Sequence, residues 1–199
     1  MTRRMVYGFG LWLTIACTAM TVASIVMPRW ISFSPNDKRN YSMGLHRRCS
    51  TITGKCTSFP DPKLCNTDEY FCAMWRTVAF LISFDVVIEL CALVSFVVII
   101  SGGVQRRSTG WQVVCSILLF GGIVQCAGMA IVASLFHTEE RFFQGWFLDT
   151  SFALCTASWS ILVLTSFGIA ATAYYLEEEG GYELIPNFGI NIETEQDEQ

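Results

Sequence analysis

The sequence predicts an all-α transmembrane bundle of four helices, capped on the outside by a small, disulfide-stapled antiparallel β-sheet. Two observations predict this fold class. Four long runs almost free of ionised residues alternate with polar segments, and four of the nine cysteines fall in one of those polar segments. Only 15% of the 199 residues are charged, and their charges are gathered between the runs. A soluble domain of this size would spread its charges along the chain.

Each of the four apolar runs is long enough to cross a membrane. The runs cover approximately residues 6–27, 77–102, 111–136 and 152–175. About 20 apolar residues in a helix cross a hydrocarbon core of about 30 Å, and spans of this length satisfy their backbone as helices. We therefore predict one membrane domain over residues 1–176. The first run exceeds the apolar core of a signal peptide, so we expect it to be retained.

Basic residues predict the orientation. Arg3 and Arg4 precede the first run, and Arg106 and Arg107 lie between the second and third, which places both segments in the cytoplasm. An even number of spans then places the C-terminus there as well. We expect a multi-pass protein of the plasma membrane with both termini cytoplasmic.

The two remaining loops, residues 28–76 and 137–151, are then extracellular. The first carries a net positive charge, which argues against this placement. Its cysteines argue for it, because cytoplasmic proteins seldom hold such a set. Asn40 also begins an Asn-Tyr-Ser acceptor for N-glycosylation, which is usable only on the outer side.

The four loop cysteines allow three disulfide connectivities, and the sequence does not choose among them. They are Cys49, Cys56, Cys65 and Cys72. Residues 41–50 and 56–59 could form a hairpin across the turn-like Thr53-Gly54-Lys55. Such a hairpin favours pairing Cys49 with Cys56, after which Cys65 pairs with Cys72. The wide spacing does not suit a zinc site, and we expect no metal.

The loop residues carry a family resemblance. Trp30 followed by Gly44-Leu45-x-x-x-Cys49 and Cys56 resembles the signature of the first extracellular loop of claudins, in the claudin and peripheral-myelin-protein superfamily. Arg76 is similar to the basic residue at the start of their second span. The resemblance implies a sheet anchored on the bundle by Trp30 and Leu45. His46 in place of the second signature Trp and the additional pair of cysteines depart from it.

Polar residues inside the predicted spans form a second candidate site. Asp85 and Glu89 lie four residues apart, on one face of the second span. Gln125 lies at a depth between them in the third span. Because a charge costs about 2.5–3.5 kcal/mol at this depth, we expect the acids to face the bundle interior, with at least one carboxyl protonated. Polar contacts between spans are the favoured interpretation, and a proton or cation relay is the alternative.

The segment after the last span predicts a disordered cytoplasmic tail. Residues 177–199 contain eight acidic residues and no Lys or Arg. Within them, Tyr182 to Ile185 has the Tyr-x-x-hydrophobic form that resembles an endocytic sorting motif.

The chain offers no catalytic constellation. Its only histidines, His46 and His137, share no motif, and no nucleotide-binding glycine loop or hydrolase motif is present. We expect no enzyme activity, no cofactor and no nucleic acid partner. The resemblance to claudins implies a role in cell–cell junctions, adhesion or paracellular barriers. The alternative is an accessory subunit of a channel, receptor or transporter. The expected partners are membrane lipids and membrane proteins, bound in cis or in trans.

Overall fold

A computed structural model describes residues 3–34, 40–102, 109–139 and 142–175. Arg106, Arg107 and the acidic tail with its Tyr182–Ile185 motif lie outside the described residues.

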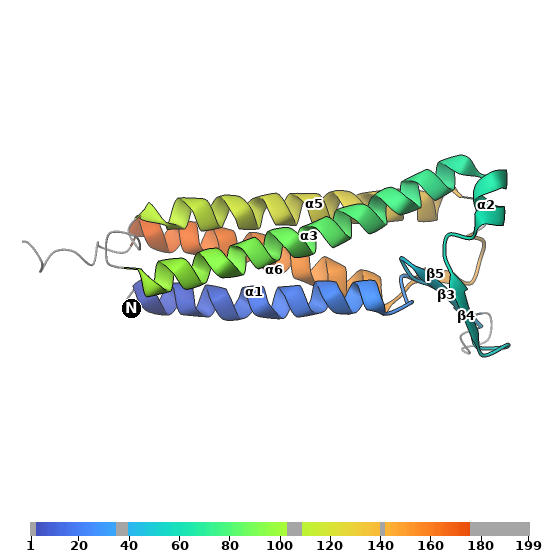
Figure 1. The fold of residues 1–199 in the computed structure, drawn as a ribbon, viewed down its shortest axis with the longest axis horizontal. Helices are drawn as coiled ribbons and strands as arrows, with labels where there is room; N and C mark the ends of the chain where they lie inside the picture. The colour runs from blue at the N-terminus through green and yellow to red at the C-terminus, as the bar shows by residue number, and fades with distance from the viewer. Residues whose placement is uncertain (1–2, 35–39, 103–108, 140–141, 176–199) are drawn as a thin grey trace, which may run out of the picture.

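Four long helices run alongside one another and form the body of the molecule (Figure 1). They are α1 (Arg3–Val26), α3 (Glu69–Ser101), α5 (Trp111–Thr138) and α6 (Thr150–Tyr175). Each packs against two neighbours, in the cyclic order α1, α3, α5, α6. All four are long and apolar enough to cross a membrane. The prediction of four apolar helices in a bundle is therefore confirmed, and the chain has the character of a multi-pass membrane protein.

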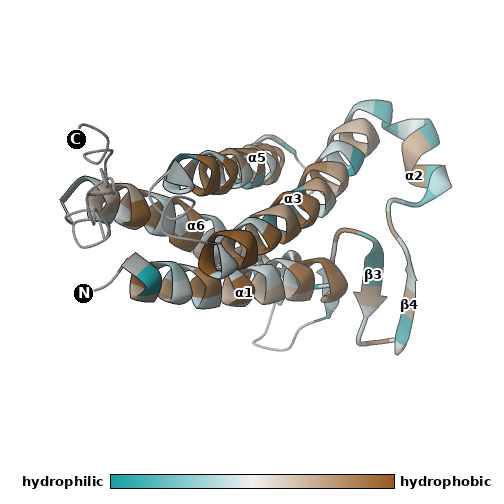
Figure 2. Cartoon of the chain, turned by 60° about the vertical axis from the view of Figure 1, so that its left-hand side comes forward, coloured by the Kyte–Doolittle hydropathy of each residue, from teal (hydrophilic) through white to brown (hydrophobic). Residues whose placement is uncertain are grey.

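The residues of the four helices are mostly hydrophobic along the length of the bundle, as Figure 2 shows. Large hydrophobic side chains such as Phe80, Val94 and Leu164 are mostly exposed. A soluble protein seldom leaves so many apolar side chains uncovered. In a lipid bilayer the same side chains lie in a solvent as apolar as themselves.

A five-stranded antiparallel sheet lies at one end of the bundle, in the strand order β4-β3-β2-β1-β5. The strands are β1 (Ile31–Phe33), β2 (Tyr41–Met43), β3 (Arg47–Ser50), β4 (Lys55–Ser58) and β5 (Trp146–Leu148). The small antiparallel sheet that was predicted is therefore present, with five strands where the predicted hairpin has two, because the first of these is divided into β2 and β3 and two further strands are added. The added strands β1 and β5 pair with each other across the two loops. Each is only three residues long, which is too short for an alternating apolar pattern to predict a strand.

The first loop differs from the sequence prediction at two places. The strand expected over residues 41–50 is interrupted between β2 and β3, and a short helix that was not predicted, α2 (Pro62–Thr67), follows the hairpin. Asp61 caps this helix, since its carboxylate accepts a hydrogen bond of 3.2 Å from the backbone N–H of Lys63. Proline in the first helical turn loses no hydrogen bond and suits this position.

Helix α3 begins at Glu69, well before the expected start of the second span at residue 77. The Asp68 carboxylate accepts a hydrogen bond of 3.1 Å from the N–H of Phe71 and caps the added turns. These turns carry Phe71 and Trp75, whose rings stack with centroids 5.6 Å apart. Both side chains are buried beneath the sheet. The extension therefore joins the sheet to the bundle.

Candidate functional site

Trp30 connects the end of α1 to the sheet. Its side chain is fully buried, and its indole N–H donates a hydrogen bond of 2.8 Å to the carbonyl oxygen of Ser24. Phe152, near the start of α6, meets the indole edge-on at 6.3 Å between ring centroids. The residue directly after Trp30 opens β1. Trp30 thus places the first strand against both α1 and α6.

Gly44 and Leu45 form a second connection, at the interruption between β2 and β3. A Cβ atom added to Gly44 would lie 2.5 Å from the Cα of Pro28, so only glycine fits this close approach. Leu45 is buried, and its carbonyl oxygen accepts a hydrogen bond of 3.3 Å from the indole of Trp75. The interrupted strand is therefore the point at which the sheet rests on the bundle.

The structure contains two disulfides, in the pairing that the hairpin favoured. Cys49 and Cys56 lie opposite each other on β3 and β4, with Cα atoms 4.1 Å apart. Cys65 and Cys72 join α2 to α3, with Cα atoms 5.4 Å apart. Arg76, exposed on the next turn of α3, donates from Nη2 to the Sγ of Cys65 at 3.8 Å.

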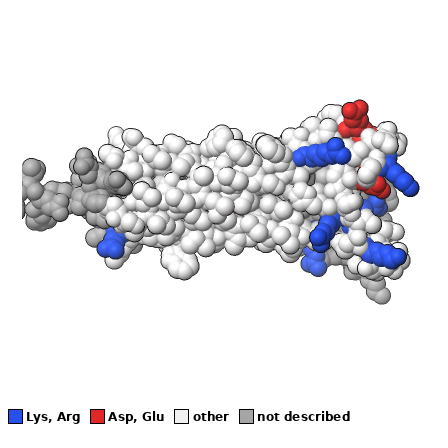
Figure 3. All heavy atoms as spheres, in the orientation of Figure 1, with Lys and Arg blue, Asp and Glu red and all other residues white. Residues whose placement is uncertain are grey.

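The hairpin of β3 and β4 is basic and exposed. Arg47, Arg48 and Lys55 lie on it, and no Asp or Glu occurs between residues 40 and 60. All four residues of β4 are exposed, and β4 is an end strand of the sheet. The guanidinium of Arg48 lies 5.6 Å from the ring centroid of Tyr41. On the face that Figure 3 shows, most of the described Lys and Arg gather at the sheet end, basic atoms also appear at the opposite end, and the middle of the bundle is bare of charge.

The second loop is joined to the first by a buried carboxylate. Asp149 lies directly after β5, and its Oδ2 accepts a hydrogen bond of 2.6 Å from the hydroxyl of Ser32 on β1. Its other oxygen accepts from the backbone N–H of Thr150 at 2.7 Å, at the start of α6. The sequence analysis did not single out Asp149. A lone acid at the border of an apolar run was the available signal, because such residues often cap helices.

Asn40 lies just before β2 and is half-buried. Its carbonyl oxygen accepts from the N–H of Thr51 at 3.1 Å. The glycosylation acceptor thus lies in the sheet region, at the end of the molecule that carries the basic hairpin.

Polar side chains from all four helices meet inside the bundle. The hydroxyl of Thr21 on α1 donates to Glu89 Oε1 on α3 at 3.0 Å and lies 2.9 Å from the hydroxyl of Ser158 on α6. Gln125 on α5 donates from Nε2 to the same threonine oxygen at 3.2 Å, and to Cys155 Sγ at 3.2 Å. These four residues, Thr21, Glu89, Gln125 and Ser158, are the polar centre of the bundle. All four are 0–1% exposed.

Asp85 lies one helical turn from Glu89 and is fully buried. A Cβ atom added to Gly121 would lie 2.9 Å from its Oδ1, so Asp85 packs against α5 one turn before Gln125. Neither carboxylate oxygen of Asp85 has a hydrogen-bond partner among the described residues. Oε2 of Glu89 and Oε1 of Gln125 also have none there. The acids therefore face the bundle interior and not the lipid-facing surface.

The sequence analysis named Asp85, Glu89 and Gln125 but missed Thr21 and Ser158. Threonine and serine are common in apolar helices, where their hydroxyls bond to the backbone one turn earlier. Whether these hydroxyls bond to another helix depends on how each helix is rotated about its axis. The sequence of an apolar run does not indicate that rotation. Among the described residues, no group of three or more His, Cys, Asp or Glu side chains could hold a metal ion.

Comparison with known families overturns the assignment to the claudins. The family model that matches the chain is that of the lipoma HMGIC fusion partner-like proteins, over residues 9–157. The match begins in α1, contains the whole sheet and three of the four residues of the polar centre, and ends within α6 at the residue before Ser158. The comparison with curated proteins finds no match.

The claudin assignment was wrong because its signature is short. A small sheet packed on the end of a bundle needs buried anchors and a close backbone approach, and more than one four-span family can share this arrangement. Here Trp30, Gly44, Leu45 and the Cys49–Cys56 disulfide provide it. The departures at His46 and at the Cys65–Cys72 pair were the signals against it. Since the matching model spans most of the chain, the chain belongs to the lipoma HMGIC fusion partner-like family, a family of four-span membrane proteins distinct from the claudins.

Proposed function

We propose that this protein is an accessory subunit that docks on a larger membrane channel, receptor or transporter and regulates it or its trafficking. The observation that carries the proposal is the exposed basic edge of the sheet, formed by β3 and β4. The proposal places this edge outside the cell, as the two disulfides and the acceptor at Asn40 support.

An end strand offers one row of backbone N–H and C=O groups to another chain. Strand addition at such an edge is a common way to bind an extended segment. The four exposed residues of β4 leave this edge open, and the Cys49–Cys56 disulfide holds its geometry. Arg47 and Lys55 beside it add positive charge. The edge therefore suits an acidic extended segment on the outer part of a partner.

The interior of the bundle supports a docking role over a transport role. The polar side chains of the four helices bond to one another at the polar centre and leave the outer surface apolar. Hydrogen bonds between polar side chains help transmembrane helices to associate into a bundle. Transporters usually add broken helices or inverted repeats around their polar sites, whereas all four helices here are continuous over their described lengths.

The family match supports this proposal more than it supports a junctional role. The junctional interpretation depended on the resemblance to claudins, and it loses that support with the family assignment. A four-span membrane family remains compatible with an accessory subunit.

Partner identification on intact cells tests the proposal. The full chain, tagged at its N-terminus, is cross-linked at the cell surface, and each captured membrane protein is tested by reciprocal co-purification. A true partner is a channel, receptor or transporter whose surface amount falls when this chain is removed. Co-purification should weaken for the variant carrying Arg47→Glu and Lys55→Glu.

Lys63→Glu provides the matched control, because Lys63 is exposed on α2 outside the hairpin and the change has the same sign. Equal weakening by Lys63→Glu would show that the edge is not the docking surface. Enrichment of the chain only where two expressing cells touch, without a change in any channel, receptor or transporter, would contradict the proposed function.

A further inference from the structure

A small cavity lies where α1 ends and the sheet begins. Its volume is about 250 Å³. Ile25, Val26 and Pro28, at the end of α1 and just after it, form its apolar part. The connection between β2 and β3 forms the rest, and His46 and Arg47 are the polar residues of that lining. Val26 is 70% exposed, and His46 and Arg47 are exposed as well, so both parts of the cavity can be reached from outside the protein.

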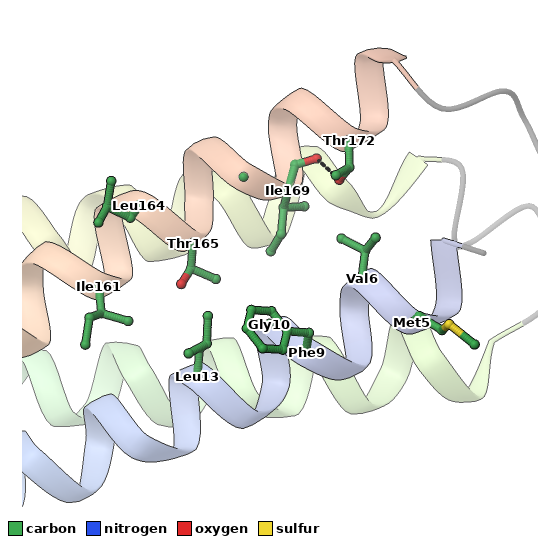
Figure 4. A pocket seen from close by; sticks show the side chains of 11 residues that line it. Met5, Val6, Phe9, Gly10, Leu13, Ile161, Leu164, Thr165, Ile169 and Thr172 are labelled. Carbon is green, nitrogen blue, oxygen red and sulfur yellow. Dashed lines mark hydrogen bonds between the residues drawn. The ribbon is translucent and has the colours of Figure 1, made fainter. Parts of the chain in front are cut away.

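A larger groove, of about 500 Å³, lies between α1 and α6 toward the opposite end of the bundle (Figure 4). Its lining consists of apolar residues, two glycines and two threonines, and includes Phe9, Leu13 and Leu164. Such a lining does not favour one chemical class of ligand over another. The smaller cavity joins an apolar part to an exposed cation, and that combination does select a ligand.

The backbone that carries the polar part of the small cavity is fixed in place. The N–H of Gly44 donates to the carbonyl oxygen of Arg47 at 2.8 Å and closes the turn between β2 and β3. The N–H of Phe59 donates to the carbonyl oxygen of His46 at 3.0 Å. Leu45, inside the turn, is buried. A ligand at this place therefore has little backbone to order, which favours binding.

Arg47 is the arginine of this region that is available to a ligand. The guanidinium of Arg48 lies over the ring of Tyr41, and Arg76 donates to the Sγ of Cys65. No such contact holds the side chain of Arg47 within the part of the chain that the structure describes. The lining of the cavity contains no Asp or Glu. The positive charge of Arg47 can therefore attract an anion.

The position of the cavity along the bundle indicates which anion that is. Helix α1 has 24 residues and is about 36 Å long at the helical rise, slightly more than a hydrocarbon core of about 30 Å. Its last turn, with Ile25 and Val26, therefore lies where the hydrocarbon meets the headgroups. The hairpin that begins at Arg47 lies beyond the end of α1 (Figure 1). Phospholipids carry their phosphate at this level of a membrane.

We propose that this cavity binds one phospholipid from the leaflet on the sheet side, with its phosphate at Arg47 and its acyl chains beside Ile25 and Val26. A guanidinium can donate to two phosphate oxygens at once, and a ring N–H of His46 can add a third hydrogen bond. The acyl chains cover the exposed side chain of Val26. Pockets for whole ligands begin at about 300 Å³, so this cavity takes the phosphate and glycerol and leaves the chains in the bilayer.

Native mass spectrometry of the delipidated full chain in mild detergent tests this site. Phosphatidylcholine is compared with a diacylglycerol of the same acyl chains, which lacks the phosphate. Wild type should bind one phosphatidylcholine about fivefold or more tightly than the diacylglycerol, because a hydrogen bond to a charged group is strong. Arg47→Gln removes the charge and should remove most of this preference. Glycerophosphocholine, which has the headgroup and no acyl chains, should not compete at equal concentration. Competition by it would assign the cavity to a free phosphate and overturn the proposal.

Arg48→Gln is the matched control, because neighbouring side chains of a strand point to opposite faces and Arg48 does not line the cavity. It should leave the preference for phosphatidylcholine unchanged. Lys55→Glu should do so too, which separates this site from the β4 edge proposed for docking. Equal affinity of wild type for the two lipids, or equal losses in Arg47→Gln and Arg48→Gln, overturns the proposal. Since the assay contains no other protein, its result does not depend on whether the chain is an accessory subunit.

Photolabelling locates the bound lipid without any variant. Wild type is reconstituted in vesicles with a phosphatidylcholine that carries a diazirine close to its glycerol, and the labelled peptides are identified after illumination. Residues 25–28 and 44–47 should be labelled more than residues 150–153, which lie at the same end of the bundle at the start of α6. Equal labelling of these segments reports only bulk lipid, and the proposal then fails.

Discussion

Gly44 shows how a single residue decides where the sheet meets the bundle. Its position leaves no room for a side chain, because the backbone of Pro28 fills the space in which a Cβ atom would lie. Leu45 follows it into the core and offers its carbonyl oxygen to Trp75. The strand breaks here because a flat strand cannot bring its backbone this close to the end of α1. Gly44 is therefore a packing residue and not a flexible one.

Gly44→Ala should destabilise the protein by about 1–3 kcal/mol, because the added methyl group meets backbone and not a movable side chain. Thermal unfolding in mild detergent, followed by tryptophan fluorescence, measures the loss. Gly8→Ala is the control, since it adds a methyl group in open space within a helix and should be neutral or stabilising by up to about 1 kcal/mol. Equal melting temperatures for Gly44→Ala and wild type would show that Gly44 does not hold the sheet on the bundle.

At the scale of elements, the polar centre joins four helices that are otherwise apolar on all sides. Thr21 is its middle residue, because its hydroxyl oxygen lies 3.0 Å from Glu89 Oε1, 2.9 Å from the Ser158 hydroxyl and 3.2 Å from Gln125 Nε2. Ser158 also donates to Glu89 Oε1 at 3.4 Å. Apolar packing alone does not specify how far each helix is rotated, since lipid is as apolar as the neighbouring helix. Hydrogen bonds from α1 and α6 reach the Glu89 carboxyl group, and Gln125 on α5 joins them through Thr21. Together these bonds set the rotations of the four helices.

Glu89→Ala should cost about 2–4 kcal/mol, because it leaves a cavity and buried hydroxyls without their acceptor. Glu89→Gln keeps an acceptor oxygen and should cost less than about 1 kcal/mol. Unfolding by denaturant in mixed micelles compares the two with Val94→Ala, a change on the exposed face of the same helix.

The relay interpretation makes the opposite prediction for the same site. If Asp85→Asn combined with Glu89→Gln folds and reaches the membrane normally but abolishes an ion flux carried by the wild type, the acids conduct and do not merely join helices. We expect the wild type to carry no such flux of its own.

The hairpin of β3 and β4 is an element held by its disulfide more than by its packing. Its residues are mostly exposed, and β4 has a neighbouring strand on one side. Replacing Cys49 and Cys56 together by serine should cost about 2–3 kcal/mol for a loop of this length. We expect the loss to stay local.

Amide hydrogen exchange tests whether loss of the Cys49–Cys56 disulfide has only a local effect, because local opening raises exchange only in the segment that opens. Residues 47–58 should lose protection, and α3 should keep it. Cys91→Ser, at an exposed free cysteine, is the matched control. Loss of protection throughout the bundle would show that the disulfide supports the whole fold.

At the scale of the molecule, the features that the proposed function uses lie at one end of the helical bundle. The basic hairpin lies at the sheet end, together with both disulfides and the acceptor at Asn40. On the face that Figure 3 shows, the middle of the bundle carries no charged residue. The surface proposed for docking is therefore confined to one end of the molecule.

The proposed orientation is tested by an epitope inserted at Gly54, in the exposed turn of the hairpin. An antibody should bind it on intact cells, whereas an N-terminal epitope should require permeabilised cells. Asn40→Gln should abolish any shift in mobility that an N-glycosidase produces on the wild type. If an antibody binds the N-terminal epitope on intact cells, the N-terminus lies outside the cell and the proposed orientation is wrong.

The sequence by itself determined the four helices, because an apolar run long enough to cross a membrane must satisfy its backbone within itself. It also favoured the Cys49–Cys56 disulfide, since two cysteines across a tight turn are close in any hairpin. Only the tertiary structure decided which polar residues meet. Thr21 and Ser158 join Glu89, and β1 pairs with β5, because contacts between distant segments depend on helix rotation and strand register. A helix that is apolar all round carries no periodic pattern that reports its rotation.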